Sequence, residues 1–173
     1  FSGAVDSIEG DPEAVGVAAV FARRKTWIAR GLYNPKSQIR VRLLTWREET
    51  IDRDFFARRI AQALALRQDF LSTTTNAYRL INGEGDFLPG LIVDRYADFL
   101  VCQFITAGWE LFKNETVAAL SSLESVHGIF EKSEGRVREE EGLGHFVGVV
   151  FGEEPPETIA IEENGFKFLV DVR

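Results

Sequence analysis

The segment ARGLYNPKSQIRVR, residues 29–42, contains four basic side chains and no acidic one, although the formal net charge of the chain is −7. Pro35 interrupts this segment, because proline cannot donate a ladder hydrogen bond and restricts the residue before it. We therefore expect one strand over residues 26–34 and another over residues 37–46. The segment raises the question of which negatively charged group it contacts.

The second of these strands alternates between aliphatic and basic side chains. Ile39, Val41 and Leu43 are separated by Arg40 and Arg42. Side chains of a strand point alternately to its two faces. The alternation predicts that both arginines face water while the aliphatic side chains fill the interior.

The composition is that of an ordinary folded protein. The chain has 173 residues, of which 45% are hydrophobic and 27% charged, which suits one large domain or two small ones. No apolar run approaches the roughly 18 residues that cross a bilayer, and no signal-peptide pattern opens the chain, so we expect a cytoplasmic protein without a membrane partner. Because it lacks methionine and ends on a strand-like segment, we expect a piece of a longer protein.

Cysteine and histidine are too sparse for the usual reactive sites. The single cysteine, Cys102, lies in the apolar stretch FLVCQF and is interpreted as a buried core residue. His127 and His145 have no serine, cysteine or aspartate partner in a catalytic pattern. We therefore predict no metal site and assign no catalytic residue.

Charge is distributed unevenly along the chain. Residues 1–50 contain eight basic and six acidic side chains, and residues 51–75 contain four and three. Residues 76–173 contain eight basic and eighteen acidic side chains. Such asymmetry suggests a polyanion-binding module joined to a second unit, although an imbalance of this size also arises from solvation alone.

The first part of the chain is predicted to be a β-unit followed by a helix. Strands over residues 16–22 and 26–34 form a hairpin with a basic tip. A helix over residues 51–70 begins with Thr50 or Asp52 as its N-cap. The apolar stripe of this helix consists of Ile51, Phe55, Phe56, Ile60, Ala63, Leu64 and Phe70. The polar residues 72–75 mark a domain boundary.

The second part is predicted to be a mixture of strands and one helix. Strand-like runs are YRLIN, GLIVDRY, FLVCQFI, GIFEKS, HFVGVVF, TIAI and FKFLVDV, and the helix is WELFKNETVAALSSL. Asn164-Gly165 predicts a type I′ hairpin turn, and Leu88-Pro89-Gly90 predicts a type II turn. The order of elements indicates an α+β fold, not a doubly wound parallel sheet.

No phosphate-binding or dinucleotide-binding glycine motif is present. The nearest pattern, Gly142-Leu-Gly144 with Gly148, lies in a charged loop beside a strand. A nucleotide-binding motif must instead follow a strand and open a helix. Carboxylates occur at Glu84, Asp86 and Asp94 and in two glutamate runs, and paired carboxylates do acid–base chemistry only where a cleft holds them at a fixed separation. The runs Glu139 to Glu141 and Glu153-Glu154 are interpreted as a solvated face. The turn-rich residues 82–90 are either a binding or domain-interface surface or a structured turn.

The basic segment remains the strongest candidate for a binding site. The candidate RNA-binding residues are Arg30, Tyr33, Asn34, Lys36, Ser37, Arg40 and Arg42. Several cations near an aromatic ring, an amide and a hydroxyl suit contacts with phosphates and unpaired bases. The alternative interpretation is an edge strand that charge protects against aggregation.

Four segments in a fixed order carry a family resemblance. They are GLYNPKSQIRVRLL, FFARRIAQALALR, YRLINGEGDFLPGLIVDRYADFLVCQF and ENGFKFLVDVR. Together they resemble the N-terminal region of the class I S-adenosylmethionine-dependent RNA methyltransferases typified by the bacterial 23S ribosomal RNA cytosine-C5 methyltransferase. The resemblance covers nearly the whole chain.

The resemblance implies a PUA-like RNA-binding β-barrel over residues 1–70, including the connector helix 51–70. It implies a central α+β domain with antiparallel hairpins over residues 75–173, and then a Rossmann-like catalytic domain that these residues lack. S-adenosylmethionine is implied for the full-length protein, but neither its glycine-rich motif nor the family's catalytic cysteine matches this sequence. We therefore expect a catalytically silent, substrate-positioning portion that binds RNA, with ribosomal RNA as the expected partner.

The acidic central unit is assigned to spacing, domain packing or self-association, with a homodimer as one expected form. The alternative from another class of protein is a non-catalytic PUA-like module whose acidic domain docks a protein partner. A reading frame that continues into a strand and a glycine-rich loop would favour the methyltransferase.

Overall fold

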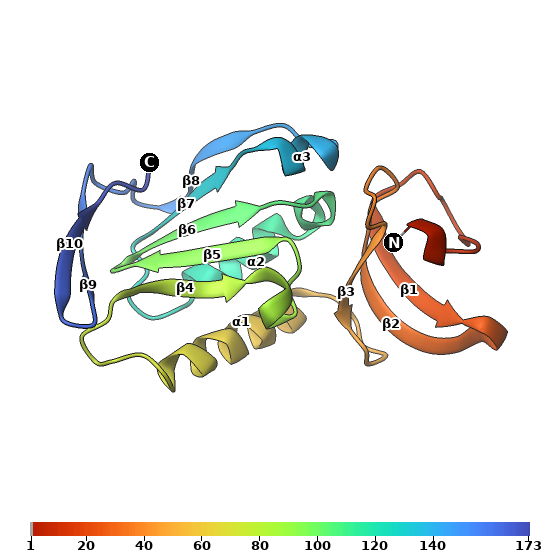
Figure 1. Cartoon of the computed structure of the whole chain (residues 1–173), viewed down its shortest axis with the longest axis horizontal. Coiled ribbons are helices and arrows are strands. Elements are labelled where there is room, and N and C mark those ends of the chain that lie inside the picture. The colour runs from red at the N-terminus through yellow and green to blue at the C-terminus, as the bar shows by residue number, and fades with distance from the viewer. Residues whose placement is uncertain (1) are drawn as a thin grey trace.

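Three sheets follow one another along the long axis of the molecule (Figure 1). The computed structural model describes residues 2–173. A three-stranded sheet lies at one end, a five-stranded sheet with its helices in the middle, and a two-stranded hairpin at the other end. Within the described residues, no helix is both long enough and apolar enough to span a bilayer.

The first sheet follows a short 3-10 turn, η1 (Ser2–Ala4). Its antiparallel strands are β1 (Gly16–Ala22), β2 (Thr26–Tyr33) and β3 (Val41–Thr45), and the 3-10 turn η2 (Arg23–Lys25) joins the first two. In residues 2–173, β1 and β3 do not pair with each other, so the predicted barrel is not closed. Closure needs strands at both edges to meet, and after β3 the chain leaves for the central unit instead.

Strand β3 is shorter than predicted, because residues 34–40 fold into a loop. The Asn34 N–H donates to the Arg40 carbonyl at 2.9 Å and closes this loop before the strand begins. The ladder between β2 and β3 then shifts register between Arg30 and Gly31. A Cβ atom at Gly31 would lie 2.1 Å from the Arg42 carbonyl oxygen, so only glycine permits this close approach.

The central unit is an α+β layer, as predicted. Its sheet has the order β4-β5-β6-β7-β8, in which only β6 and β7 run parallel. The strands are β4 (Ala77–Asn82), β5 (Leu91–Tyr96), β6 (Phe99–Phe104), β7 (Gly128–Ser133) and β8 (Phe146–Gly152). The helices are α1 (Arg53–Gln68), α2 (Lys113–Ser121) and α3 (Arg136–Glu140), with 3-10 turns η3 (Gly83–Asp86) and η4 (Ala107–Leu111). Helices α1 and α2 cover one face of this sheet (Figure 1).

Helix α1 begins where the sequence predicts but packs with the central unit. The Asp52 carboxylate accepts a hydrogen bond from the Phe55 N–H at 2.9 Å, which confirms the N-cap. Phe55, Phe56, Ile60 and Ala63 are buried against α2 and the central sheet. Phe70 is 82% exposed, contrary to the prediction, because the helix has already ended at Gln68.

Both predicted tight turns are confirmed. Gly90 has φ of 83°, and the Leu91 N–H donates to the Leu88 carbonyl at 3.0 Å, as in a type II turn. Asn164 and Gly165 have φ of 52° and 84° and connect β9 (Ile159–Glu163) to β10 (Phe166–Val170). Positive φ at both central residues is the type I′ requirement.

One hydrophobic core runs from the first sheet into the central unit. Leu32 and Leu44 of the first sheet are buried in the same cluster as Phe56 and Trp109. The backbone of η4 comes so close to β2 that a Cβ at Gly108 would lie 2.5 Å from Leu32 Cβ. The two units therefore pack directly against each other at this glycine.

We expect Gly108→Ala to destabilise the protein, because the added methyl group would overlap Leu32, which is itself fixed in the core. Overpacking of this kind costs roughly 1–3 kcal/mol of unfolding free energy. Urea unfolding would measure the loss. Gly144→Ala is the control, since a Cβ there meets no atom within 4 Å, and equal stabilities for both variants would contradict the close packing.

Candidate functional site

The structure separates the seven predicted RNA-binding residues into an interior and an exposed group. Tyr33, Asn34 and Ser37 are buried, and only 16% of the Arg42 side chain is exposed. The predicted outward orientation of Arg42 is therefore wrong. Its strand position faces the central unit, where Glu141 supplies the negative charge.

Glu141 is the centre of the interior group. Its carboxylate accepts hydrogen bonds from Ser37 Oγ at 2.5 Å, Asn34 Nδ2 at 2.8 Å and Arg42 Nη2 at 3.3 Å. The Ala107 N–H, from the central unit, adds a fourth at 3.3 Å. The side chain of Glu141 is only 4% exposed. The buried carboxylate thus joins the first sheet to the central unit.

The interpretation of residues 139–141 as a solvated acidic run fails at Glu141. Glu139 and Glu140 are exposed and pair with His145 and Arg136, but Glu141, the residue after α3, is buried. Nothing in a run of three glutamates distinguishes the buried member. The polar residues Asn34 and Ser37 opposite it are the only available signal.

The pKa of Glu141 lies below its ordinary value. Burial by itself raises the pKa of a carboxyl group, but the hydrogen bonds from Ser37, Asn34 and the Ala107 N–H, together with the charge of Arg42, outweigh burial. The ionised form is therefore favoured in the folded state.

We expect this interface to weaken in acid. Because the folded-state pKa is depressed, Glu141 contributes stability that is present above the ordinary value of 4.5 and is lost as pH falls through the lower folded-state pKa. Glu141→Gln should remove this pH-dependent component and lower the unfolding free energy at pH 7 by roughly 1–3 kcal/mol, since glutamine keeps one acceptor oxygen but turns an NH2 donor toward the remaining buried donors. Thermal unfolding across pH 3–7 would measure both effects, and the exposed Glu140→Gln is the matched control. Parallel pH profiles for wild type and Glu141→Gln would contradict this role.

The remaining predicted residues have accessible side chains. Lys36 is exposed, and Arg30 and Arg40 are half-buried. Arg30 donates through Nη1 to the Glu49 carbonyl at 2.5 Å and lies over the Trp27 ring. Within residues 2–173, neither Lys36 nor Arg40 forms a salt bridge. These two cations are free to meet a phosphate.

Tyr33 and Arg42 have intramolecular partners that complete the interior group. The Tyr33 hydroxyl donates to the Pro12 carbonyl at 2.7 Å, so it holds the N-terminal segment against β2. Arg42 also lies 3.6 Å from the exposed Glu84 carboxylate. Both side chains are engaged within the protein.

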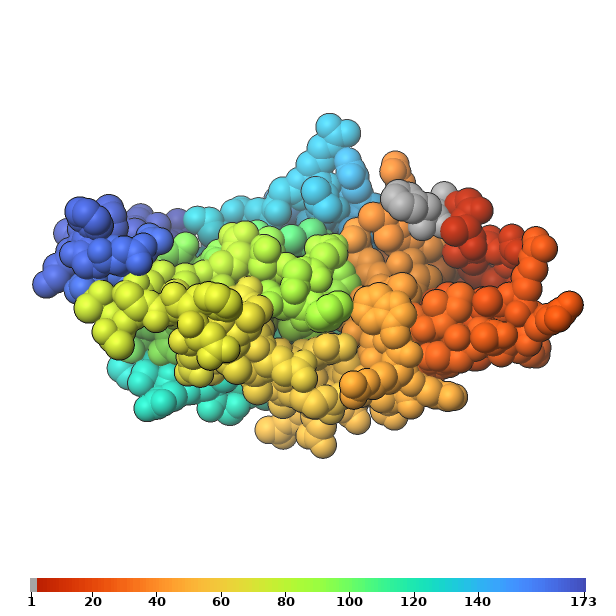
Figure 2. Space-filling view, turned by 60° about the horizontal axis from the view of Figure 1, so that its bottom comes forward, coloured from red at the N-terminus to blue at the C-terminus, as the bar shows by residue number. Residues whose placement is uncertain are grey.

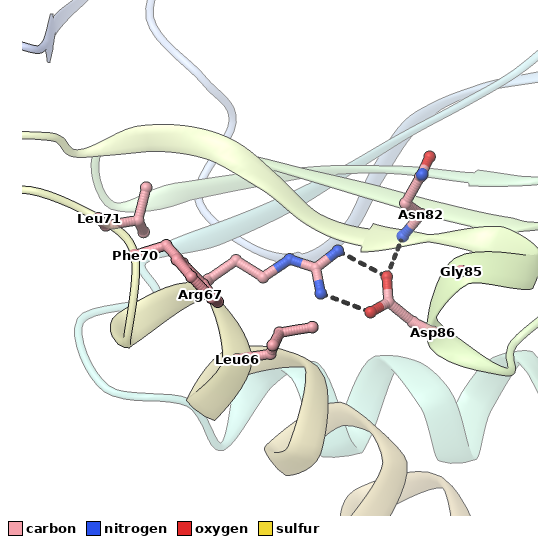
Figure 3. Close-up of a pocket in the computed structure, with 7 residues that line it drawn as sticks. All are labelled: Leu66, Arg67, Phe70, Leu71, Asn82, Gly85 and Asp86. Carbon is pink, nitrogen blue, oxygen red and sulfur yellow. Dashed lines mark hydrogen bonds and ion pairs between the residues drawn. The ribbon is translucent and has the colours of Figure 1, made fainter.

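Residues 82–90 form a structured turn beside a shallow hollow of about 380 Å³ (Figure 3). Asp86 is paired with the Arg67 guanidinium through both oxygens and accepts a bond from the Asn82 N–H at 2.6 Å. The lining residues are Leu66, Arg67, Phe70, Leu71, Asn82, Gly85 and Asp86. The ion pair between Arg67 and Asp86 joins α1 to η3. Because these two charged groups pair with each other, neither is free for chemistry in the hollow.

Cys102 lies in the core, as predicted. Its side chain is fully buried, and burial, followed by the nearby charge of Glu131, raises the pKa of the thiol far above its ordinary range. A thiol kept protonated is a poor nucleophile. Within residues 2–173, no three His, Cys, Asp or Glu side chains gather as a metal-ion site.

The described residues contain no glycine-rich loop of the kind that binds S-adenosylmethionine. Such a loop follows a strand and opens a helix. Gly142 and Gly144 instead lie between the end of α3 and the start of β8, and a Cβ at Gly142 would contact the Lys36 side chain. This glycine segment belongs to the contact between the two units.

Residues 1–46 match a PUA-like domain model. Over its whole length, the chain is 43% identical to "Ribosomal RNA large subunit methyltransferase I" of Tolumonas auensis. Over 99% of its length, it is 45% identical to the protein of the same name from Aliivibrio fischeri strain MJ11. The chain spans 44% of each of these relatives.

Two solved structures share the fold. One is described as an S-adenosylmethionine-dependent methyltransferase from Streptococcus mutans, with a TM-score of 0.75 and 23% identity. The other is described as a methyltransferase in complex with S-adenosylhomocysteine, with a TM-score of 0.76 and 23% identity. The matches cover 90% and 95% of this chain but 40% of each solved chain.

Proposed function

We propose that this chain is the RNA-binding, substrate-positioning portion of an S-adenosylmethionine-dependent methyltransferase that acts on cytosine C5 of large-subunit ribosomal RNA in the cytoplasm. The observation that carries the proposal is the alignment of the whole chain with ribosomal RNA methyltransferases at 43–45% identity, of which it spans 44%. The PUA-like match over residues 1–46 supports RNA as the partner.

The division of labour follows from what these residues offer. They supply a basic first sheet but no accessible cysteine nucleophile and no glycine-rich cofactor loop between a strand and a helix. A cytosine-C5 methyltransferase must hold the base and the methyl donor together. We therefore assign RNA anchoring to this chain and methyl transfer to the remainder of a longer protein.

The accessible cations Lys36 and Arg40 are the best test of RNA contact within the predicted set. Arg42→Glu would place a second carboxylate beside Glu141, so a loss of binding would report on unfolding of the interface. Lys36 and Arg40 form no salt bridge with the described residues, so their replacement removes no ion pair from the protein.

We expect the chain to bind structured ribosomal RNA weakly, with an affinity that falls as salt rises. Lys36→Glu/Arg40→Glu should reduce the slope of log affinity against log salt by roughly 1.4–1.8, the value for two lost phosphate contacts. Fluorescence anisotropy over a series of salt concentrations would measure the slope.

The control variant is Lys167→Glu/Arg173→Glu, which changes net charge equally at the opposite end of the molecule (Figure 1). Equal losses in both variants would reduce the effect to overall charge and would remove Lys36 and Arg40 from the RNA contact.

We expect S-adenosylmethionine to leave the melting temperature of this chain unchanged, because a ligand stabilises only a folded state that it binds. Differential scanning fluorimetry with millimolar cofactor would measure the shift. A concentration-dependent rise would show a cofactor site within these residues and would contradict the assignment of methyl transfer to the rest of the protein.

A further inference from the structure

Two exposed aromatic rings meet where the first sheet joins the central unit. Trp46 directly follows β3, and Phe87 directly follows η3. Their ring centroids lie 5.8 Å apart at an interplanar angle of 85°, an edge-to-face arrangement. Trp46 remains 53% exposed and Phe87 48% exposed. An edge-to-face pair leaves ring surface uncovered, onto which a flat group can stack.

The backbone at Phe87 is held in an unfavourable conformation. Its φ of 58° lies in the left-handed region, which a bulky residue rarely adopts. Its N–H donates to the Glu84 carbonyl at 3.2 Å, and the next N–H, of Leu88, donates to the Gly83 carbonyl at 3.0 Å. Glycine would satisfy this turn without strain, yet the position carries an exposed phenyl ring. Strain at an exposed aromatic residue indicates a use for that ring.

Arg59 places a cation over the ring of Phe87. Its guanidinium lies 5.2 Å from the Phe87 ring and 5.3 Å from the Phe55 ring, and Nη2 donates to the Leu44 carbonyl at 3.0 Å. These contacts fix the guanidinium on α1 while its charge stays next to the exposed rings.

Two arginines and one glutamate surround Arg59. Burial is the largest cause and lowers the pKa of Arg59. Among the neighbouring charges Glu49 has the largest effect and raises this pKa, whereas Arg58 and Arg47 lower it. Arg58 already pairs with that same Glu49 at 2.5 Å. A phosphate group brought to this place would relieve the repulsion among the three arginines.

The same surface continues onto the first sheet. The Trp27 Nε1–H donates to the Trp46 carbonyl at 3.2 Å, and the Arg30 guanidinium lies 5.3 Å from the Trp27 ring. Figure 2 shows the orange segment that contains β3 lying between β1–β2 and the yellow and green atoms of the central unit. Aromatic side chains with an arginine on either side therefore extend across the junction of the two units.

We propose that Trp46, Phe87 and Arg59 form a stacking site for unpaired nucleotides of RNA, in which a base lies on the exposed rings and its phosphate meets the arginines. The proposal rests on the proposed RNA-binding function and names a surface outside the basic segment of residues 29–42. Base stacking on aromatic side chains with nearby arginines is how proteins hold single-stranded nucleic acid. A duplex would offer this site phosphates but no free base face.

The test uses the whole chain and a fluorescein-labelled RNA hairpin with an eight-nucleotide unpaired loop, compared with a blunt duplex of the same stem. Trp46→Ala and Phe87→Gly should each weaken hairpin binding by roughly five- to 150-fold, the range for one lost stacked base. Glycine at position 87 accepts the positive φ, so this variant keeps the turn. Trp46→Phe, which retains a ring, should restore most of the affinity. Duplex binding should change little.

Phe168→Ala is the control, because Phe168 is 49% exposed on β10 at the far end of the molecule. Full hairpin affinity in both Trp46→Ala and Phe87→Gly, with a loss in Lys36→Glu/Arg40→Glu, would overturn the stacking site and leave the proposed function intact. Equal losses of affinity for the hairpin and the duplex would also overturn the stacking site. Failure of the unaltered chain to bind either RNA would overturn the proposed function as well.

Discussion

The buried carboxylate of Glu141 is the constraint on which the arrangement of the two units depends. It accepts hydrogen bonds from the first sheet and from the central unit. Because its side chain is only 4% exposed, water does not replace these donors. A buried charge is tolerated only while its partners remain in place, since removing one leaves the others unsatisfied. The first sheet is therefore held in one orientation, with Leu32 and Leu44 completing the core beneath it.

This constraint changes the meaning of the basic segment at residues 29–42. Arg42, Asn34 and Ser37 bind the Glu141 carboxylate within the protein, so these polar side chains stabilise the interface between the two units. Lys36 and Arg40 are cations of this segment that form no salt bridge within residues 2–173, and the stem of Lys36 lies against Gly142. The same rigid junction brings Trp46, after β3, beside Phe87 of the central unit. A surface composed from both units exists only because their orientation is fixed.

The features that sequence predicts well here are local ones. The Asp52 cap, the Asn164-Gly165 turn and the Gly90 turn depend on a few neighbouring residues, and all three are confirmed. The α+β class follows from the order of such elements. Barrel closure and the burial of Glu141 depend on contacts between distant segments, and one glutamate of three gives no local sign of its environment. The alternation of side chains along β3 predicts an exposed Arg42, because the alternation carries no information about the unit that packs against that face of the strand.

An acidic protein can still bind RNA if its cations are local and its acids are distant. Charges separated by more than about 10 Å are largely screened at 0.1 M salt, so a phosphate responds mainly to the nearest groups. Most of the acidic excess lies in residues 76–173, whereas at the junction Arg47, Arg58 and Arg59 outnumber Glu49, the one acid that acts on Arg59. The acidic surface then disfavours the wrong approaches without weakening the right one. On the proposed function, net charge thereby guides RNA toward the junction, and the exposed rings of Trp46 and Phe87 select for bases that are free to stack.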